Sequence, residues 1–262
     1  MLARLLRSVR TILAAVTVAG LVVPAGAALA GHDSDTFTIA TRLTDSKFDP
    51  AFHFAEFDAV NILNIYEGLV RPVKGKPPTG QLAESWEASP DGKVWTFKLH
   101  NGVKFHDGGN LTANDVVYSM DRFLTLGKGY SSLLKGILDV GNTKALDDLT
   151  VQFTLNTSFG PFVDVLVQFY VVNSELLRVN QKAGDNGANG DYGTDYLLSH
   201  DAGSGPYKLD SFVPDRRRIL VAHGDYRGGW SDGQFKRIVI EIVGETATAR
   251  SLLTAGDVDF VD

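Results

Sequence analysis

Catalysis needs a nucleophile, a general base or a set of metal ligands, and the sequence offers few candidates for any of these. His100, His106 and Asp107 lie close together in the chain, but strand geometry would direct the two histidines apart. Ser204 lies in the segment AGSGP, which lacks the glycines two residues before and two after the serine that a nucleophile elbow needs. No H-E-x-x-H segment and no cysteine are present, so thiol catalysis, disulfides and thiolate metal sites are excluded. We therefore predict a protein that is not an enzyme, with no catalytic residues, no metal site and no cofactor.

Two further groupings could bind a ligand. Residues 183–193, AGDNGANGDYG, are rich in glycine, but they match neither G-x-x-x-x-G-K-[ST] nor a dinucleotide-binding fingerprint. Their composition favours turns and predicts a linker or flexible loop. The arginines at 216–218 form a basic cluster, which a salt-bridged sheet edge explains better than an anion site.

The overall charge bears on the kind of partner. The formal net charge is −6, and a nucleic-acid-binding protein would need a basic footprint instead. We therefore expect no nucleic-acid partner.

Residues 89–123 are the best-defined stretch of predicted structure. Pro90-Asp91-Gly92 predicts a turn, and the alternation over residues 94–99 predicts a strand. Asn101-Gly102 predicts a type I′ hairpin turn, with both residues at positive φ, that returns the chain through residues 103–105. Thr112 is placed as the N-cap of a helix, with Asp115 completing a capping box. This unit is a scaffold and carries no chemistry of its own.

Other segments complete the prediction of an α/β protein. Alternating residues predict strands at 36–40, 150–155, 207–212, 218–222 and 235–243. Apolar spacing predicts helices at 60–66, 131–138, 162–169 and 247–253, the last ended by Gly256.

The N-terminus has the pattern of a secretory signal peptide. Arg4, Arg7 and Arg10 precede an apolar stretch over residues 11–23, and the sequence Ala-Leu-Ala follows at 28–30. The apolar run is shorter than the ~20 residues that span a bilayer. We therefore predict a signal peptide over 1–30, cleavage before Gly31 and no stable membrane insertion afterwards. Without a cysteine to carry a lipid anchor, the mature protein is expected to be free in the periplasm.

Several blocks along the chain resemble one known family in the same order. They are FDPAF (48–52), NIYEGLVRP (64–72), LAESWEASPDG (82–92), WTFKLHNGVKFHDG (95–108), LTANDVVYSMDRF (111–123), LDDLTVQFTL (146–155), GSGPYKL (203–209), HGDYRGGW (223–230) and TARSLLTAGDVDF (248–260). Together they resemble the family 5 extracellular solute-binding proteins, the dipeptide-, oligopeptide- and nickel-binding components of ABC importers.

The resemblance implies a fold and a function. It implies an α/β lobe like that of type II (cluster C-like) periplasmic binding proteins, formed by a mixed sheet from residues 31–73 and 194–262. An α+β subdomain, residues 74–193, would be inserted in this lobe. Because the family runs to about twice this length, the second lobe is expected to be absent, and the chain would be an N-terminal portion.

The implied function is the periplasmic substrate-binding component of an ABC importer. Its expected partners are a peptide or other small solute and an inner-membrane ABC permease. Peptides are the favoured ligand class, with nickel complexes, opines and oligosaccharides as alternatives. A non-binding remnant of such a receptor and a periplasmic hydrolase are the competing interpretations.

The resemblance also implies four ligand-binding residues: Phe54, Ala55, Glu67 and Tyr130. Phe54 and Ala55 match a part of the cleft wall, and Tyr130 matches a loop that reaches the cleft in dipeptide-binding relatives, although packing would explain its place as well. Glu67 matches an acidic residue that faces the peptide in the oligopeptide-binding branch. It could pair with a cationic ligand group, or it could lie at a helix end in solvent or cap a neighbouring backbone group.

Overall fold

The computed structural model describes residues 34–42, 48–53 and 56–262, except for the side chains of residues 56–59. All described elements lie in one compact unit, Asp33–Asp262. The predicted signal peptide, Phe54 and Ala55 lie outside the described residues.

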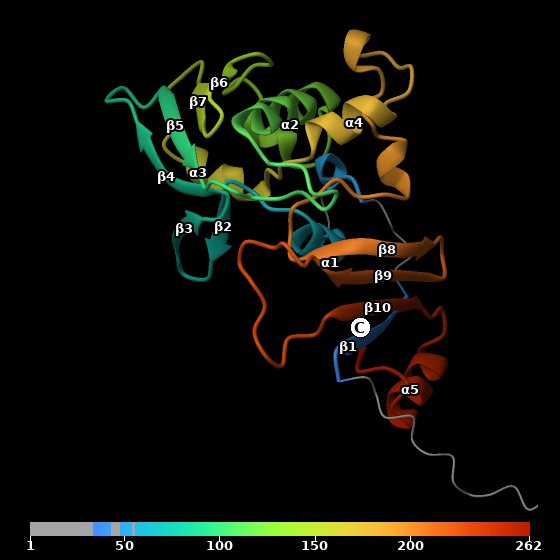
Figure 1. The fold of residues 1–262 in the computed structure, drawn as a ribbon. Coiled ribbons are helices and arrows are strands. Elements are labelled where there is room, and N and C mark those ends of the chain that lie inside the picture. Colours follow the sequence, from blue (N-terminus) through green and yellow to red (C-terminus); the bar gives the residue numbers. More distant parts are fainter. Residues whose placement is uncertain (1–33, 43–47, 54–55) are drawn as a thin grey trace, which may run out of the picture. The chain divides into compact units, whose positions relative to one another are not determined.

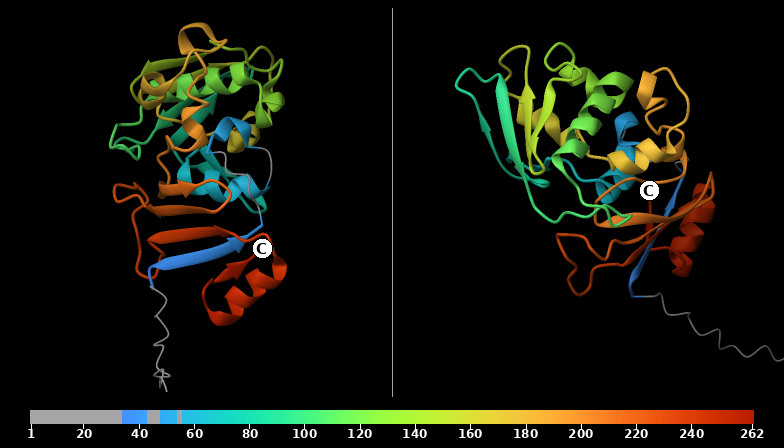
Figure 2. Two further views of the ribbon diagram at one scale, coloured as in Figure 1. Left: turned by 90° about the vertical axis from the view of Figure 1, so that its right-hand side faces the viewer. Right: turned by 45° about the horizontal axis from the view of Figure 1, so that its top comes forward.

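A five-stranded mixed sheet is formed by strands from both ends of this unit (Figure 1). Its order is β11-β1-β10-β9-β8, made of β1 (Thr36–Thr41), β8 (Tyr207–Val213), β9 (Arg217–Ala222), β10 (Arg237–Ile242) and β11 (Phe260–Val261). Strands β8, β9 and β10 form an antiparallel meander, and β1 runs parallel to both β10 and β11. Helix α5 (Thr246–Ala255) connects β10 to β11 and packs on β1 through Ala249 and Ala40 (Figure 2). It ends at Gly256 as predicted.

A four-stranded antiparallel sheet lies between these segments in the sequence. Its order is β4-β5-β7-β6, made of β4 (Ala83–Ala88), β5 (Val94–Leu99), β6 (Thr143–Asp147) and β7 (Thr150–Thr154). A separate hairpin, β2 (Val70–Val73) with β3 (Lys76–Gly80), precedes it. Because this hairpin spans residues 73 and 74, a subdomain boundary at that point would divide it. The proposed boundaries therefore remain a proposal.

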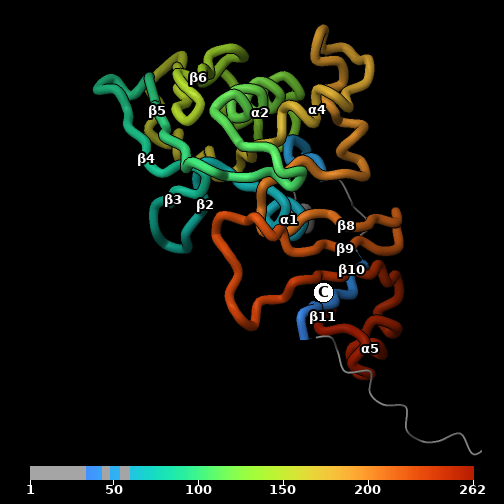
Figure 3. The backbone as a smooth tube through the Cα atoms, viewed as in Figure 1, coloured from blue at the N-terminus to red at the C-terminus, as the bar shows by residue number. Residues whose placement is uncertain are grey.

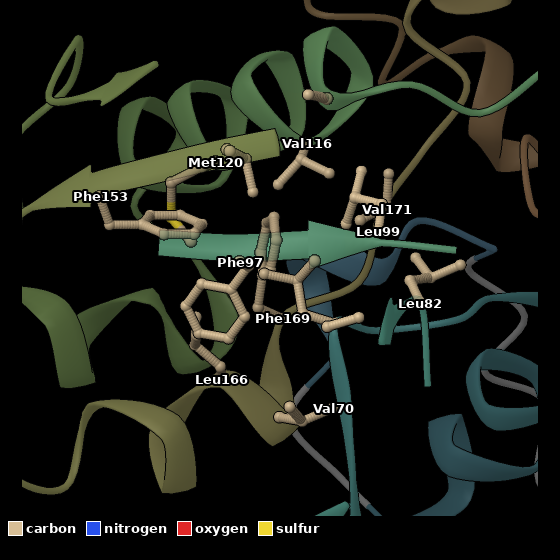
Figure 4. Close-up of a cluster of buried hydrophobic side chains, with 14 of the residues drawn as sticks. Val70, Leu82, Phe97, Leu99, Val116, Met120, Phe153, Leu166, Phe169 and Val171 are labelled. Carbon is tan, nitrogen blue, oxygen red and sulfur yellow. The ribbon is translucent and has the colours of Figure 1, made fainter. Parts of the chain in front are cut away.

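Helix α2 (Ala113–Leu126) covers the four-stranded sheet, as the apolar stripe over residues 116–124 requires. Val116 and Met120 of the helix meet Phe97 of β5 and Phe153 of β7 in one buried cluster (Figure 4). The predicted capping box is confirmed, since the Asp115 carboxylate accepts hydrogen bonds from the Thr112 backbone N–H and hydroxyl at 2.9 and 3.0 Å. The capping residues thus fix where the helix begins, and the apolar stripe fixes which face it buries.

The remaining helices are short. They are α1 (Glu56–Ile65), α3 (Phe162–Val165), α4 (Ser174–Asn180) and the 3₁₀ turns η1 (Pro50–Phe52), η2 (Gly129–Leu134), η3 (Leu166–Gln168), η4 (Gly187–Asn189) and η5 (Tyr196–Leu198). The helical stretch predicted at 131–138 forms only in part, as the 3₁₀ helix η2, which ends at Leu134. A loop forms at 183–193, as predicted, apart from the 3₁₀ turn η4. The Asp191 carboxylate accepts hydrogen bonds from the backbone N–H groups of Lys182, Gly193 and Asp195 and so fastens this loop.

The type I′ hairpin predicted at Asn101-Gly102 is wrong. Only Gly102 has a positive φ, 76°, whereas Asn101 does not. Strand β5 already has β4 on one edge and β7 on the other, so residues 103–105 cannot return along it. They pair instead with residues 109–111, through hydrogen bonds from Phe105 N–H to the Gly109 carbonyl and from Leu111 N–H to the Val103 carbonyl. The neighbours of β5, which are distant in sequence, override the local turn signal.

Gly102 still provides a test of the turn. We expect Gly102→Ala to lower the free energy of unfolding by about 1 kcal/mol, because alanine resists positive φ. A Cβ at Gly102 meets no atom within 4 Å, so the loss would be purely conformational. Gly160→Ala is the matched control, since Gly160 also has open space but no positive φ. Equal urea midpoints for the two variants would contradict the assigned turn.

Candidate functional site

Glu67 lies two residues after the end of helix α1 and is almost completely buried, with 1 % of its surface exposed. Its backbone carbonyl accepts a hydrogen bond from Val171 N–H at 3.0 Å, and the next residue, Gly68, donates to the Gln81 side chain at 3.1 Å. One carboxylate oxygen, Oε2, accepts a hydrogen bond from the Ser204 hydroxyl at 3.0 Å. The exposed helix-end position considered from the sequence is therefore wrong.

The segment that supplies Ser204 presses closely on the end of α1. A Cβ at Gly203 would lie 2.0 Å from the Ile65 carbonyl oxygen, and one at Gly205 would lie 2.7 Å from that of Asn64. Gly205 N–H donates to the Ile65 carbonyl at 2.8 Å and so satisfies one of the carbonyls that a helix end leaves unpaired. The glycines on both sides of Ser204 are thus required for its contact with Glu67.

Burial raises the pKa of Glu67 to about 7, partly offset by the Ser204 hydrogen bond and by the nearby positive charges of Arg227 and His106. A carboxyl in this environment changes its charge near neutral pH. Burial and the charge of Glu67 in turn raise the pKa of the half-buried Tyr226. Arg227 donates to the Gln81 carbonyl at 2.9 Å. The loop between β9 and β10 (Figure 3) therefore supplies Arg227 and Tyr226 to the surroundings of Glu67.

A second polar group lies behind Ser204. The His106 ring nitrogen Nδ1 lies 2.6 Å from Asp201 Oδ1, and Nε2 lies 3.1 Å from the Gly205 carbonyl oxygen. The His106 backbone N–H donates to the Gly203 carbonyl at 2.9 Å. This pairing could not be predicted from the sequence, because the KFHDG and GSGPYKL blocks are far apart in the chain and carry no local sign of contact.

Tyr130 lies beside the residues that lead into Phe54. Its ring centroid is 5.7 Å from that of His53, which is 6.2 Å from that of Tyr170. Tyr170 forms an isolated β-bridge with Gly68, the neighbour of Glu67. Tyr130 and Glu67 are therefore connected through His53, Tyr170 and Gly68.

The described residues also contain a hollow next to the His106 pair. It has a volume of about 370 Å³ and is lined by residues that include His106, Asp107, Asn173, Asp201 and Lys208. Asp107 and Asp201 are already engaged there: Asn173 donates to Asp107 at 2.8 Å, and Leu209 N–H donates to Asp201 at 2.8 Å. No group of three or more His, Cys, Asp or Glu side chains within the described part of the chain could hold a metal ion.

None of the described helices is both long and apolar enough to cross a bilayer.

Comparison with known proteins gives a consistent result. Residues 77–262 match the model of "Bacterial extracellular solute-binding proteins, family 5 Middle". Among curated proteins, the probable D,D-dipeptide-binding periplasmic protein DdpA of Escherichia coli K12 is 34% identical over 235 residues, which are 87% of this chain and 43% of that protein. The chain thus spans less than half the length of this relative.

Two solved structures share the fold at similar coverage. The binding protein DppA from Helicobacter pylori, in complex with the peptide STSA, has a TM-score of 0.69 and 26% identity over 85% of this chain and 45% of that one. The binding protein MoaA from A. tumefacien R10, in complex with mannopinic acid, has a TM-score of 0.73 and 26% identity over 86% of this chain and 44% of that one. The fold is therefore that of part of a type II periplasmic binding protein, as the sequence predicted. The chain belongs to the bacterial extracellular solute-binding proteins of family 5.

Proposed function

We propose that the chain forms part of the periplasmic substrate-binding component of an ABC importer, with peptides as its ligand class. The observation that carries this proposal is the 34% identity to a probable D,D-dipeptide-binding protein over 87% of the chain. The peptide complex of the Helicobacter pylori relative favours the same class. An opine is the second candidate, because the equally similar MoaA was solved with mannopinic acid.

Glu67 offers a physical reason for preferring a peptide. A buried carboxylate gains most from a cationic partner, because charge-assisted hydrogen bonds strengthen where water is excluded. A peptide carries such a cation at its amino end. We propose Glu67, Tyr130, Phe54 and Ala55 as residues of the ligand wall, with Glu67 recognising positive charge.

Amide NMR spectra recorded during a titration test the ligand class. We expect di- to pentapeptides to shift the signals of Gly68 and Ser204 at millimolar concentrations, since one wall of a cleft provides only part of the contacts and each tenfold of affinity corresponds to about 1.4 kcal/mol. Glu67→Gln should abolish these shifts, whereas Glu87→Gln, at an exposed position on β4, should retain them. Shifts with mannopinic acid and none with peptides would transfer the proposal to opines. Shifts with neither would favour a non-binding remnant, and release of amino acids from the peptides would indicate a hydrolase.

Export to the periplasm is the second part of the proposal and yields a separate prediction. Expressed with residues 1–30 in a double-membraned bacterium, the protein should be recovered from the periplasm with Gly31 as its first residue. The three arginines, the short apolar run and Ala28-Leu29-Ala30 motivate this expectation. N-terminal sequencing checks it, with Ala30→Leu as a variant that should block cleavage. Met1 retained in a membrane fraction of the unaltered protein would contradict it.

A further inference from the structure

His106 joins two segments that are almost one hundred residues apart. It lies in the connection between β5 and α2, and its partners Asp201, Gly203 and Gly205 lie in the segment that leads into β8 (Figure 1). This second segment also carries Ser204, which holds the Glu67 carboxylate. A change in the contacts of His106 would therefore affect the hydrogen bonds that this segment makes to the end of α1 and to Glu67.

Both ring nitrogens of His106 face atoms that can only accept hydrogen bonds. Nδ1 faces a carboxylate oxygen of Asp201, and Nε2 faces the Gly205 carbonyl. A neutral imidazole has one N–H and can satisfy only one of these acceptors, whereas an imidazolium satisfies both. The geometry is therefore that of the protonated ring.

Asp201 is held as a carboxylate by its own surroundings. Oδ1 accepts a further hydrogen bond from Gly203 N–H at 3.1 Å, and Oδ2 accepts one from Leu209 N–H at 2.8 Å. Burial alone would raise the pKa of Asp201, but the hydrogen bond and charge of His106 and these two N–H groups hold it below its usual value. The proton between Asp201 and His106 thus belongs to the histidine.

Other titratable groups lie around the pair on every neighbouring element. The His223 ring, which follows β9, stands edge-on to His106 at 4.8 Å, and burial together with the His106 charge lowers the pKa of His223. Glu67, after α1, is also close enough to interact with His106. The hollow beside the ring adds the charged residues Asp107, Lys208 and Asp210.

We propose that His106 is a proton-dependent latch: when its ring is protonated, it fastens the β5–α2 connection to residues 201–205. The protonation of His106 thereby sets the rigidity of the segment that carries Ser204, the hydrogen-bond partner of Glu67. When the ring loses a proton, the Asp201 carboxylate retains the Nδ1–H, because charge-assisted hydrogen bonds are the stronger ones. Nε2 then presents a lone pair to the Gly205 carbonyl oxygen, and this contact becomes repulsive. Gly205 then loses its contact with His106, while its N–H still holds the Ile65 carbonyl and its backbone still accepts from His223. The device is independent of which ligand the protein binds.

The test measures the protonation of the His106 ring and the hydrogen-exchange protection of residues 203–205 in one sample of the full chain. Long-range ¹H–¹⁵N spectra report the protonation of each ring nitrogen between pH 5 and 9, and the His106→Gln spectrum assigns the signal among the six histidines. Hydrogen-exchange protection factors, which remove the intrinsic pH dependence of exchange, report the segment. We expect protection of Gly203 and Gly205 to fall roughly three- to tenfold as the ring deprotonates, the size expected for one lost hydrogen bond. Protection of Phe97 in β5 should stay constant.

Two variants separate His106 from its titrating neighbours. His106→Gln should remove the pH-dependent change at 203–205, and Glu67→Gln should leave it in place. A His106 ring that stays singly protonated throughout would overturn the latch, and this result needs no variant to fold. The latch is equally overturned if protection at 203–205 follows pH in His106→Gln as it does in the unaltered protein.

Discussion

Replacing Arg122 with methionine is expected to lower the free energy of unfolding by about 3–5 kcal/mol, the range for removing one partner of a buried ion pair. Arg122 and Asp49 are 2% and 5% exposed, respectively, and their side chains meet in a bidentate pair. Nη1 donates to Oδ1 at 2.7 Å and Nη2 donates to Oδ2 at 2.5 Å. The remaining Nε donates to the Tyr192 carbonyl at 2.9 Å. Methionine would leave the Asp49 carboxylate and the Tyr192 carbonyl buried without these donors.

The experiment compares the midpoints of urea unfolding of the variants, which report stability when the dependence of the unfolding free energy on urea concentration is unchanged. Arg250→Met is the matched control, because Arg250 is an exposed arginine on helix α5, and we expect it to change stability by less than about 0.5 kcal/mol. Combining Arg122→Met with Asp49→Asn should recover part of the loss, since the asparagine is neutral and its oxygen can still accept the Ala51 N–H. A loss for Arg122→Met equal to that for Arg250→Met would show that the pair does not form.

The Arg122–Asp49 pair also shows what the sequence could and could not predict. Both residues belong to blocks that carried the family resemblance, FDPAF and VYSMDRF. The helix that holds Arg122 could be located from its cap and apolar stripe, because those signals are local. The partner could not, because Asp49 lies in a loop without periodicity and only the folded chain brings the two together.

The type I′ turn predicted at Asn101-Gly102 was wrong for the same reason, since contacts between distant segments decide the structure there. Asn101-Gly102 is a strong local signal, but strand pairing depends on the neighbours that β5 finds at β4 and β7. Glu67 was selected as a site residue by resemblance, yet its burial and its contact with Ser204 depend on residues more than one hundred positions away. Local elements were therefore predictable, whereas contacts between distant segments were not.

Glu67→Gln is expected to stabilise the protein in a pH-dependent way. The pKa of Glu67 rises from 4.5 to about 7 on folding, chiefly because the side chain is buried. Each pKa unit corresponds to 1.36 kcal/mol, so ionising this carboxyl in the folded protein costs about 3 kcal/mol. Because the folded pKa is raised, the stabilising contribution is fully present below about pH 4.5 and is lost as pH rises through about 7. Glutamine cannot ionise, and its carbonyl oxygen can still accept the Ser204 hydroxyl.

The variant and the unaltered protein should therefore be about equally stable near pH 4, and the variant should be more stable by up to about 3 kcal/mol at pH 8. Urea denaturation at several pH values gives the difference, in which titrations common to both proteins cancel. Glu87→Gln, on the exposed face of β4, should give a difference that does not change with pH. A flat difference for Glu67→Gln as well would mean that Glu67 is paired or solvated in solution. If a cationic ligand group does bind Glu67, adding that ligand at pH 8 should stabilise the unaltered protein more than the variant, because the cation offsets a cost that only the carboxylate carries.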